Sequence, residues 1–301
     1  MAQAVTTAST TARRAETAKR PRTGQIVLRV LFYAIVIVIL LYALLPFYWA
    51  IRSSLTPSAD LFRTPVQYIP THPTLQNYRD VLGTGLFRQA LLNSAIVSIS
   101  VTLLALIIGS FASYALGRFR FAGRTPVLYL ILSMTMFPQI AVLGSLFQLV
   151  NTLRLFNQLP ALIVTYMIFT LPFTVWTLTN FFRGMPGELE EAAYVDGATP
   201  FQTFYKVLLP LAGPGLVTTG LLAFISAWNE FLFALSFTQT PDKRTVNLAI
   251  FYFSGSSGNS FEIPWGQIMA ATVIVTVPIV ALVLIFQRRI IDGLTAGAVK
   301  G

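Results

Sequence analysis

The sequence contains no cysteine. Disulfide bonds, zinc–thiolate sites and thiol nucleophiles are therefore excluded. Its single histidine, His72, stands between Pro70 and Pro73, and a lone loop histidine is far more often a surface residue than a metal ligand. No Ser/His/Asp set, carboxylate pair or metal cluster is arranged for catalysis. The sequence therefore indicates no catalytic residue and no metal site, and we do not expect an enzyme.

Charge is also scarce. Only 11% of the 301 residues are charged and 55% are hydrophobic, whereas a soluble domain is about a quarter charged. About 20 consecutive apolar residues suffice for a helix to cross the hydrocarbon core of a membrane. Six uncharged runs are long enough: Val30–Ile51, Gln89–Gly117, Thr125–Leu153, Leu155–Phe182, Val207–Asn229 and Ile263–Gln287.

These runs are expected to be helices, because backbone groups in lipid must be bonded within the segment. A transmembrane barrel would show short alternating segments instead. The predicted fold class is therefore all-α, a polytopic membrane protein with six transmembrane helices. Helix-breaking residues inside the runs predict kinks. They are Gly109, Pro138, Pro172 and Pro278.

The net charge is +10, and the positions of the basic residues indicate the orientation of the chain in the membrane. Basic residues gather at alternate ends of the runs, with fourteen on the side that holds both chain ends and seven on the other. The positive-inside rule then places both termini in the cytoplasm. This distribution favours attraction to anionic membrane lipid over binding to nucleic acid.

The chain is expected to have three parts. Residues 1–25 are predicted to be a disordered basic cytoplasmic tail, since they lack apolar periodicity. Residues 26–287 form the transmembrane domain, and 288–301 a cytoplasmic tail. The first apolar run is too long for a signal peptide and is followed by bulky residues, so we interpret it as a retained anchor.

No phosphate-binding loop for ATP is present, because no lysine follows a glycine. Charge within the spans is almost absent as well, and the exception is Glu230, which follows Asn229 at the end of the fifth run. Two interpretations stay open for these two residues: a solvated or packing position at a helix end, and a role in a solute pathway.

Two further polar stretches stand out. The loop Thr238–Pro264 contains a Gly/Ser-rich run that is either a plain flexible linker or a substrate-side contact loop. Its candidate contact residues are Gly255, Ser256, Ser257, Gly258 and Asn259. The other stretch, residues 183–210, is a connector on the side that the charges mark as cytoplasmic.

The connector is predicted to contain two short helices joined at a glycine. The first begins after Pro186-Gly187 with acidic residues, which favour the positive end of a helix dipole. Gly197 suits a left-handed C-terminal turn. Thr199 is a good N-cap with proline at the first helical position after it, and the second helix is expected over Phe201–Leu208. A chain with such a connector but no nucleotide site is expected to draw its energy from a partner.

The spacing of this connector resembles the "EAA" signature of permease subunits of bacterial ABC importers. The matching residues are Glu191-Ala192-Ala193, Gly197, Val207, Leu209 and Pro210, with Val207 where isoleucine is commoner. Other stretches resemble the second permease of the maltose/trehalose-type carbohydrate-uptake branch. They are Asn93-Ser94, Asp196-Gly197-Ala198, Ala227–Glu230 and the terminal Gly293–Gly301. The similarity extends from about Val30 to the end.

The resemblance implies a type I importer permease in a bacterial cytoplasmic (inner) membrane. Its partners would be a second, different permease in a heterodimer, two ATPase subunits that hold ATP and Mg²⁺, and an extracytoplasmic sugar-binding protein. This chain itself would bind no cofactor. The ATPase-coupling residues would be Glu191, Ala192, Ala193, Asp196 and Gly197.

The resemblance also implies the solute and a contact with the binding protein. The solute would be a maltose- or trehalose-like disaccharide or oligosaccharide, and the loop Gly255–Asn259 would reach towards the sugar-binding protein. The alternative is a self-sufficient secondary carrier of a polar uncharged solute. Such a carrier would need an ion-coupling site or inverted repeats, and the sequence presents neither convincingly.

Overall fold

A computed structural model describes residues 23–253 and 263–296. These residues fold into helices and connecting turns. The chain divides into two units, Met1–Trp49 and Ala50–Gly301. The first unit contains most of α1 (Thr23–Ser54), whose large apolar side chains are exposed around the helix. An all-round hydrophobic helix of this length is typical of a membrane span. Because α1 begins at Thr23, the end of the expected disordered tail is helical.

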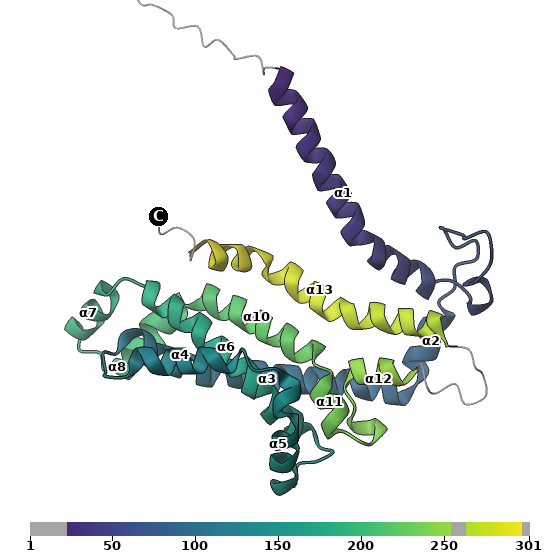
Figure 1. Cartoon of the computed structure of the whole chain (residues 1–301). Helices are drawn as coiled ribbons and strands as arrows, with labels where there is room; N and C mark the ends of the chain where they lie inside the picture. The colour runs from purple at the N-terminus through teal and green to yellow at the C-terminus, as the bar shows by residue number, and fades with distance from the viewer. Residues whose placement is uncertain (1–22, 254–262, 297–301) are drawn as a thin grey trace, which may run out of the picture. The chain divides into compact units, whose positions relative to one another are not determined.

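The second unit is a bundle of helices with short elements at both ends (Figure 1). Its long helices are α3 (Gly85–Arg118), α6 (Leu159–Gly184), α10 (Gly213–Asn229) and α13 (Trp265–Ala296). The helices of intermediate length are α4 (Arg124–Met134) and α5 (Gln139–Thr152). The short elements are η1 (Ser58–Asp60), α2 (Gln76–Gly83), α7 (Glu188–Val195), α8 (Pro200–Thr203), η2 (Phe204–Leu208), α9 (Leu209–Leu211), α11 (Leu232–Phe237), η3 (Pro241–Lys243) and α12 (Val246–Phe253).

The apolar helices agree with the predicted fold class. Among the described residues, four helices are long and apolar enough to cross a membrane, and the number is six if each of two bent pairs counts as one span. A kink was predicted at Pro138, between α4 and α5, whereas no bend was predicted within the fifth run. Helices α4 and α5 meet at 95°, and the segment Pro200–Leu211 meets α10 at 75°.

Prolines account for both breaks. Pro138 lies in extended conformation before α5, and without an N–H it cannot continue the hydrogen bonds of the preceding helix. Pro210 and Pro214 flank the second bend. By contrast, α6 continues through Pro172 and α13 through Pro278. Helix α13 also extends past Gln287, where the last span was expected to end.

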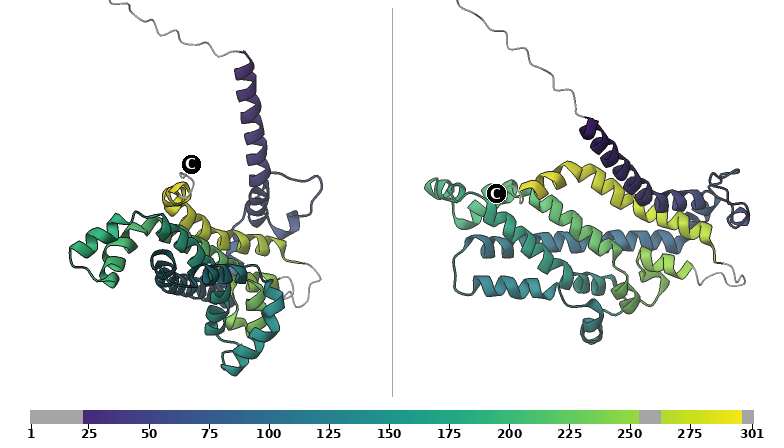
Figure 2. Two further views of the ribbon diagram at one scale, coloured as in Figure 1. Left: turned by 60° about the vertical axis from the view of Figure 1, so that its left-hand side comes forward. Right: turned by 45° about the horizontal axis from the view of Figure 1, so that its top comes forward.

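The bundle centres on the seam between α3 and α6, with α10 packed against both, and the views in Figure 2 show these helices side by side. Helix α3 continues through Gly109. A methyl group added there would lie 2.7 Å from the Thr174 side chain, so glycine allows close approach of the two helices. Ser113 donates a hydrogen bond across the same seam to the Val175 carbonyl at 3.0 Å. Small residues and interhelical hydrogen bonds are typical of helix packing in membranes.

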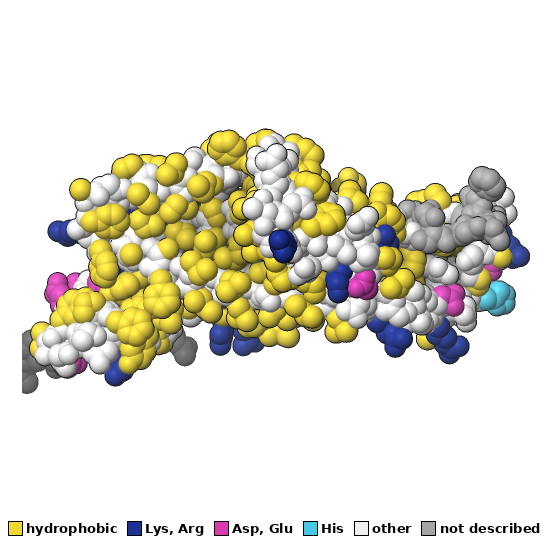
Figure 3. Space-filling model, turned by 90° about the horizontal axis from the view of Figure 1, so that it is seen from below, with side chains coloured by type: hydrophobic (Ala, Val, Ile, Leu, Met, Phe, Trp, Pro, Cys, Tyr) yellow, Lys and Arg dark blue, Asp and Glu magenta, His cyan; other side chains and the backbone are white. Residues whose placement is uncertain are grey.

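The opposite face of α3 carries a stripe of large apolar side chains. Leu92, Ile96, Ile99, Leu103 and Ile107 recur every three or four residues and are about half exposed. Figure 3 shows a face of the protein on which hydrophobic side chains predominate and basic side chains form small separate groups. Exposed apolar surface on this scale is expected of a protein whose solvent is lipid.

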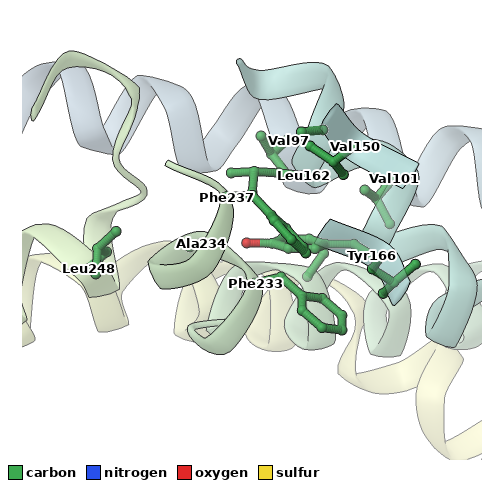
Figure 4. Packing of buried hydrophobic residues seen from close by; sticks show 12 residues of the cluster. Val97, Val101, Val150, Leu162, Tyr166, Phe233, Ala234, Phe237 and Leu248 are labelled. Carbon is green, nitrogen blue, oxygen red and sulfur yellow. The ribbon is translucent and has the colours of Figure 1, made fainter. Parts of the chain in front are cut away.

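A second packed region lies away from the connector, where α11 meets α6. Tyr166 extends from α6 towards α11, and Phe233 and Phe237 pack beside it (Figure 4). The ring centroids of Tyr166 and Phe233 are 6.4 Å apart. Val97 and Val101 of α3 complete this buried cluster, so α11 is fixed to the two central helices.

Candidate functional site

The connector lies at one end of the bundle, and α2 and α12 lie at the other (Figure 1). Its first helix, α7, begins directly after Pro186-Gly187 as predicted, with Glu188, Glu190 and Glu191 in the first turn. The second helix begins at Pro200, is α-helical to Thr203, and continues as a π-helical turn over Phe204–Leu208. The predicted pair of short helices is therefore present.

Gly197 ends α7 in the left-handed conformation, with φ +78°. Its N–H donates to the Tyr194 carbonyl at 3.0 Å, and the N–H of Ala198 donates to the Ala193 carbonyl at 2.9 Å. This pair of bonds forms a Schellman motif, which satisfies the last carbonyls of a helix and requires a positive φ at the residue that glycine occupies here. The predicted role of Gly197 in the turn is confirmed.

Thr199 caps the second helix as predicted. Its hydroxyl accepts a hydrogen bond from the Gln202 N–H at 3.2 Å, and the Gln202 side-chain oxygen accepts one from the Thr199 N–H at 2.8 Å. This reciprocal pair is a capping box. Because both ends of the turn are satisfied by local bonds, the angle between α7 and α8 is set by the connector itself.

The five predicted coupling residues do not share one environment. Glu191, Ala192, Asp196 and Gly197 are exposed and can meet another protein. Ala193 is 7% exposed and faces inwards. Its small side chain contributes to packing within the connector, and a coupling role for Ala193 stays a prediction.

Two exposed residues of α7 were missed by the sequence reasoning. Val195 is 88% exposed and Tyr194 is 45% exposed. An apolar side chain that projects beside Asp196 and Gly197 adds hydrophobic area to the surface that a partner would cover. These two residues could have been included from the sequence, because they lie in the last turn of α7 next to the predicted coupling residues.

The connector is packed onto the ends of the central helices. Phe204 and Leu208 are buried with Tyr114 of α3 and with Leu178 and Phe182 of α6. A displacement of the connector is therefore transmitted to α3 and α6 through packed aromatic and aliphatic side chains.

Glu230 has a structural role at the other end of α10. Its two carboxylate oxygens accept hydrogen bonds from the N–H groups of Phe233 at 2.8 Å and Ala234 at 3.2 Å, which caps α11. Asn229 is exposed and donates to the Ile225 carbonyl at 2.9 Å. The cavity beside Glu230 is about 10 Å³, room for a single water molecule at most. A role of these two residues in a solute pathway stays a prediction.

We expect Glu230→Ala to lower the thermal unfolding midpoint of the detergent-solubilised protein, since two backbone N–H groups lose their acceptor at a cost of about 1–3 kcal/mol each when buried. Glu230→Gln keeps one carbonyl oxygen as an acceptor and should lose less. Equal midpoints for wild type and Glu230→Ala would contradict the capping role. Loss of uptake in a stable Glu230→Gln variant would favour the pathway interpretation.

The candidate contact loop at residues 255–259 lies outside the described residues. The segment before α12 is described, and two asparagines hold it. Asn157, with φ 60°, accepts hydrogen bonds at its side-chain oxygen from the N–H groups of Gln239 at 2.9 Å and Thr240 at 3.0 Å. Asn93 donates to the carbonyls of Asp242 at 2.8 Å and Arg244 at 2.9 Å.

The side chains of this segment also interact with one another. Hydrogen bonds from the Thr240 and Lys243 side chains lower the pKa of the exposed Asp242 carboxyl below its usual value. The Arg244 guanidinium lies 3.6 Å from the centroid of the Tyr252 ring, a cation–π distance. The segment that leads into α12 therefore has a defined shape.

Together, the bundle and its connector define a polytopic helical membrane protein with a pair of locally capped short helices at one end. A family model described as "Binding-protein-dependent transport system inner membrane component" matches residues 103–295. The chain belongs to this family of ABC importer permeases, and the resemblance seen in its connector is confirmed.

Two relatives extend the match over most of the chain. The trehalose transport system permease protein SugB of Mycobacterium tuberculosis is 45% identical over 260 residues, 86% of this chain and 93% of that protein. The trehalose/maltose transport system permease protein MalG of Thermococcus litoralis is 41% identical over 279 residues, 92% of this chain and 99% of that protein.

A solved structure agrees in fold. It is a bacterial ABC transporter involved in the import of the acidic polysaccharide alginate, and one of its chains superimposes with a TM-score of 0.78. The match covers 89% of this chain and 98% of that one, at 22% identity. The all-α polytopic fold is therefore that of an ABC importer permease.

Proposed function

We propose that this chain is a permease subunit that imports a disaccharide or oligosaccharide of the trehalose or maltose type, with energy from ATP that partner subunits hydrolyse. The observation that carries the proposal is the connector. It has a locally fixed shape, exposes Glu191, Ala192, Asp196 and Gly197, and is packed onto α3 and α6. The names of the two relatives support the type of sugar.

The mechanism follows from that packing. ATP-driven closure of two ATPase subunits displaces α7 and α8, and the ends of α3 and α6 move with them because Phe204 and Leu208 are buried between these elements. The spans then pass between inward-open and outward-open arrangements. This chain contributes no nucleotide chemistry, and ATP and Mg²⁺ belong to the ATPases.

The proposed assembly has the connector and both chain ends in the cytoplasm of a bacterium, with the chain in the cytoplasmic membrane. A second, different permease completes the path, and an extracytoplasmic binding protein delivers the sugar. The family description, which specifies a binding-protein-dependent system, supports the last partner. The basic excess at the connector side of the spans supports the orientation.

Residues Gly255–Asn259 are proposed to contact the binding protein. In the sequence they lie between α12 and α13, and α12 is at the end of the bundle away from the connector. Removing residues 254–260 is expected to slow sugar uptake while basal ATPase activity of the assembled transporter stays at the wild-type level. The measurement is uptake at increasing binding-protein concentrations. Uptake equal to wild type at every concentration would rule out this contact.

The decisive test is reconstitution. The tagged chain is purified in mild detergent with its co-purifying subunits, placed in liposomes with internal ATP, and given radiolabelled trehalose, maltose and an unrelated disaccharide. ATP-dependent uptake of trehalose or maltose is expected, together with co-purification of a P-loop ATPase. Purification of the chain alone, with uptake driven by an ion gradient, would reject the proposal in favour of a secondary carrier.

A further inference from the structure

Arg118, the last residue of α3, is paired with the coupling helix. Its Nε donates to Oε2 of Glu190 in α7 at 2.7 Å, and its Nη2 forms an ion pair with the same oxygen. The side chains are only 10% and 16% exposed. A charge pair this far removed from solvent is screened less than a surface pair, and losing either partner leaves a largely buried charge.

The same guanidinium also holds the end of α6. It donates to the carbonyls of Met185 at 2.9 Å, Phe182 at 3.3 Å and Pro186 at 3.3 Å. These carbonyls lie in the last turn of α6 and in the link to α7, where backbone acceptors lack helical partners. A cation is also favourable at a helix C-terminus. One side chain therefore joins three helices.

Two further contacts fix the ends of α3 and α6 to each other. Arg183 of α6 donates to the Leu116 carbonyl of α3 at 3.3 Å. At Gly117, an added methyl group would lie 3.2 Å from Cβ of Phe182. Only Met185, Pro186 and Gly187 link the end of α6 to the start of α7. Arg118 donates hydrogen bonds to the carbonyls of Met185 and Pro186 in this link.

We propose that Arg118 is a positioning residue that makes α7 move as one body with the ends of α3 and α6. This inference rests on the proposed function. A displacement of α7 then moves the end of α3 as well, because α7 cannot rotate independently about the short link between α6 and α7. The role needs arginine in particular, because a guanidinium presents a fixed fork of donors to several acceptors at once, whereas lysine presents a single ammonium.

Neighbouring basic residues provide matched controls. Arg120 is exposed, and Arg124 bonds within its own turn to the Phe119 carbonyl at 3.2 Å. Arg120→Gln removes the same charge two residues from Arg118 without touching the three-helix contact. It should therefore behave as wild type in each experiment below.

The first experiment measures coupling in the complete reconstituted transporter. Sugar molecules imported per ATP hydrolysed are compared for wild type, Arg118→Gln, Glu190→Gln, the double variant and Arg120→Gln. We expect Arg118→Gln to lower this ratio about tenfold, the scale of losing one buried charge-assisted hydrogen bond. Glu190→Gln should lower it less, since the carbonyl contacts persist, and the double variant should match Arg118→Gln because the two residues act together.

A second experiment measures the distance between α7 and α3 directly. Because the chain contains no cysteine, Glu188→Cys in α7 and Ile108→Cys in α3 give a unique pair of spin labels in the full chain without ATPases. The distance distribution should be narrow in wild type and with Arg120→Gln, and should broaden with Arg118→Gln. Arg118→Lys should fall between them.

The outcomes separate this inference from the proposed function. An unchanged transport ratio in Arg118→Gln, or equal loss of transport and ATP hydrolysis, overturns it, and so does an unbroadened distance distribution. If Arg118→Gln fails to assemble, Glu190→Gln decides, and a wild-type ratio there overturns the inference. Absence of ATP-dependent uptake in wild type rejects the proposed function, and the spin-label distances still decide whether Arg118 positions α7.

Discussion

Replacing Gly197 with proline is expected to reduce uptake about 100-fold while the protein still inserts in the membrane, since a proline in an incompatible conformation costs about 3 kcal/mol or more. Proline cannot adopt the φ of +78° found here. It also removes the N–H that donates to the Tyr194 carbonyl. The residue before a proline prefers an extended ψ, whereas Asp196 has ψ 5°. The measurement is ATP-driven sugar uptake normalised to the amount of protein in the membrane.

The matched control is Gly197→Asn. Asparagine is the residue other than glycine that enters the left-handed region most readily, and it keeps the N–H. Open space surrounds the position, with nothing within 4 Å of an added methyl group. Uptake should therefore remain within a few-fold of wild type. Normal uptake by a well-expressed Gly197→Pro variant would refute the role of this turn, and equal loss in both variants would show that only the absence of a side chain matters.

Gly109→Leu is expected to destabilise the whole bundle, with a cost of about 3 kcal/mol for overpacking a close helix contact. Even a methyl group at this position would lie 2.7 Å from Thr174, which is itself fully buried. The α3 and α6 backbones would have to separate, and the hydrogen bond from Ser113 to Val175 would lengthen or break. A lower thermal unfolding midpoint in detergent, with less monodisperse protein after extraction, is the expected observation.

Gly144→Leu is the corresponding control for this experiment. Gly144 lies inside α5, is exposed, and has nothing within 4 Å of an added methyl group. The same substitution there should leave the midpoint unchanged or raise it, because leucine favours a helix interior by up to about 1 kcal/mol over glycine. A midpoint for Gly109→Leu equal to that of Gly144→Leu would mean that α3 and α6 can separate at no cost.

The connector could be predicted from the sequence because its structure is local. Glu188 lies in the first turn of α7, and Gly197 and Thr199 bond to backbone or side-chain groups within a few residues. Their spacing alone indicates where a helix begins, turns and begins again. The apolar runs were equally readable, since a span is defined by length and composition. The membrane fold followed from these two kinds of short-range information.

The contacts between helices could not be predicted in this way, because they join residues that are far apart in the sequence. Arg118 could only be counted as a basic residue at a membrane edge, because its acceptors are more than sixty residues away. Gly109 was taken as a helix breaker, although its role is to admit Thr174 from another helix. Pro138 did indicate a disturbance of the third span, but the 95° angle between α4 and α5 and the contact of α5 with α11 could not be derived from the sequence.

The capping bonds of the connector also make it transferable. The Schellman motif at Gly197 and the capping box at Thr199 lie wholly within residues 193–202, so this stretch carries its own shape when it is moved to another chain. Its attachment to the bundle is concentrated in Glu190 and in buried side chains such as Phe204. If the connector docks on an ATPase as proposed, a hybrid permease that exchanges the exposed residues between these anchors should acquire the ATPase preference of the donor.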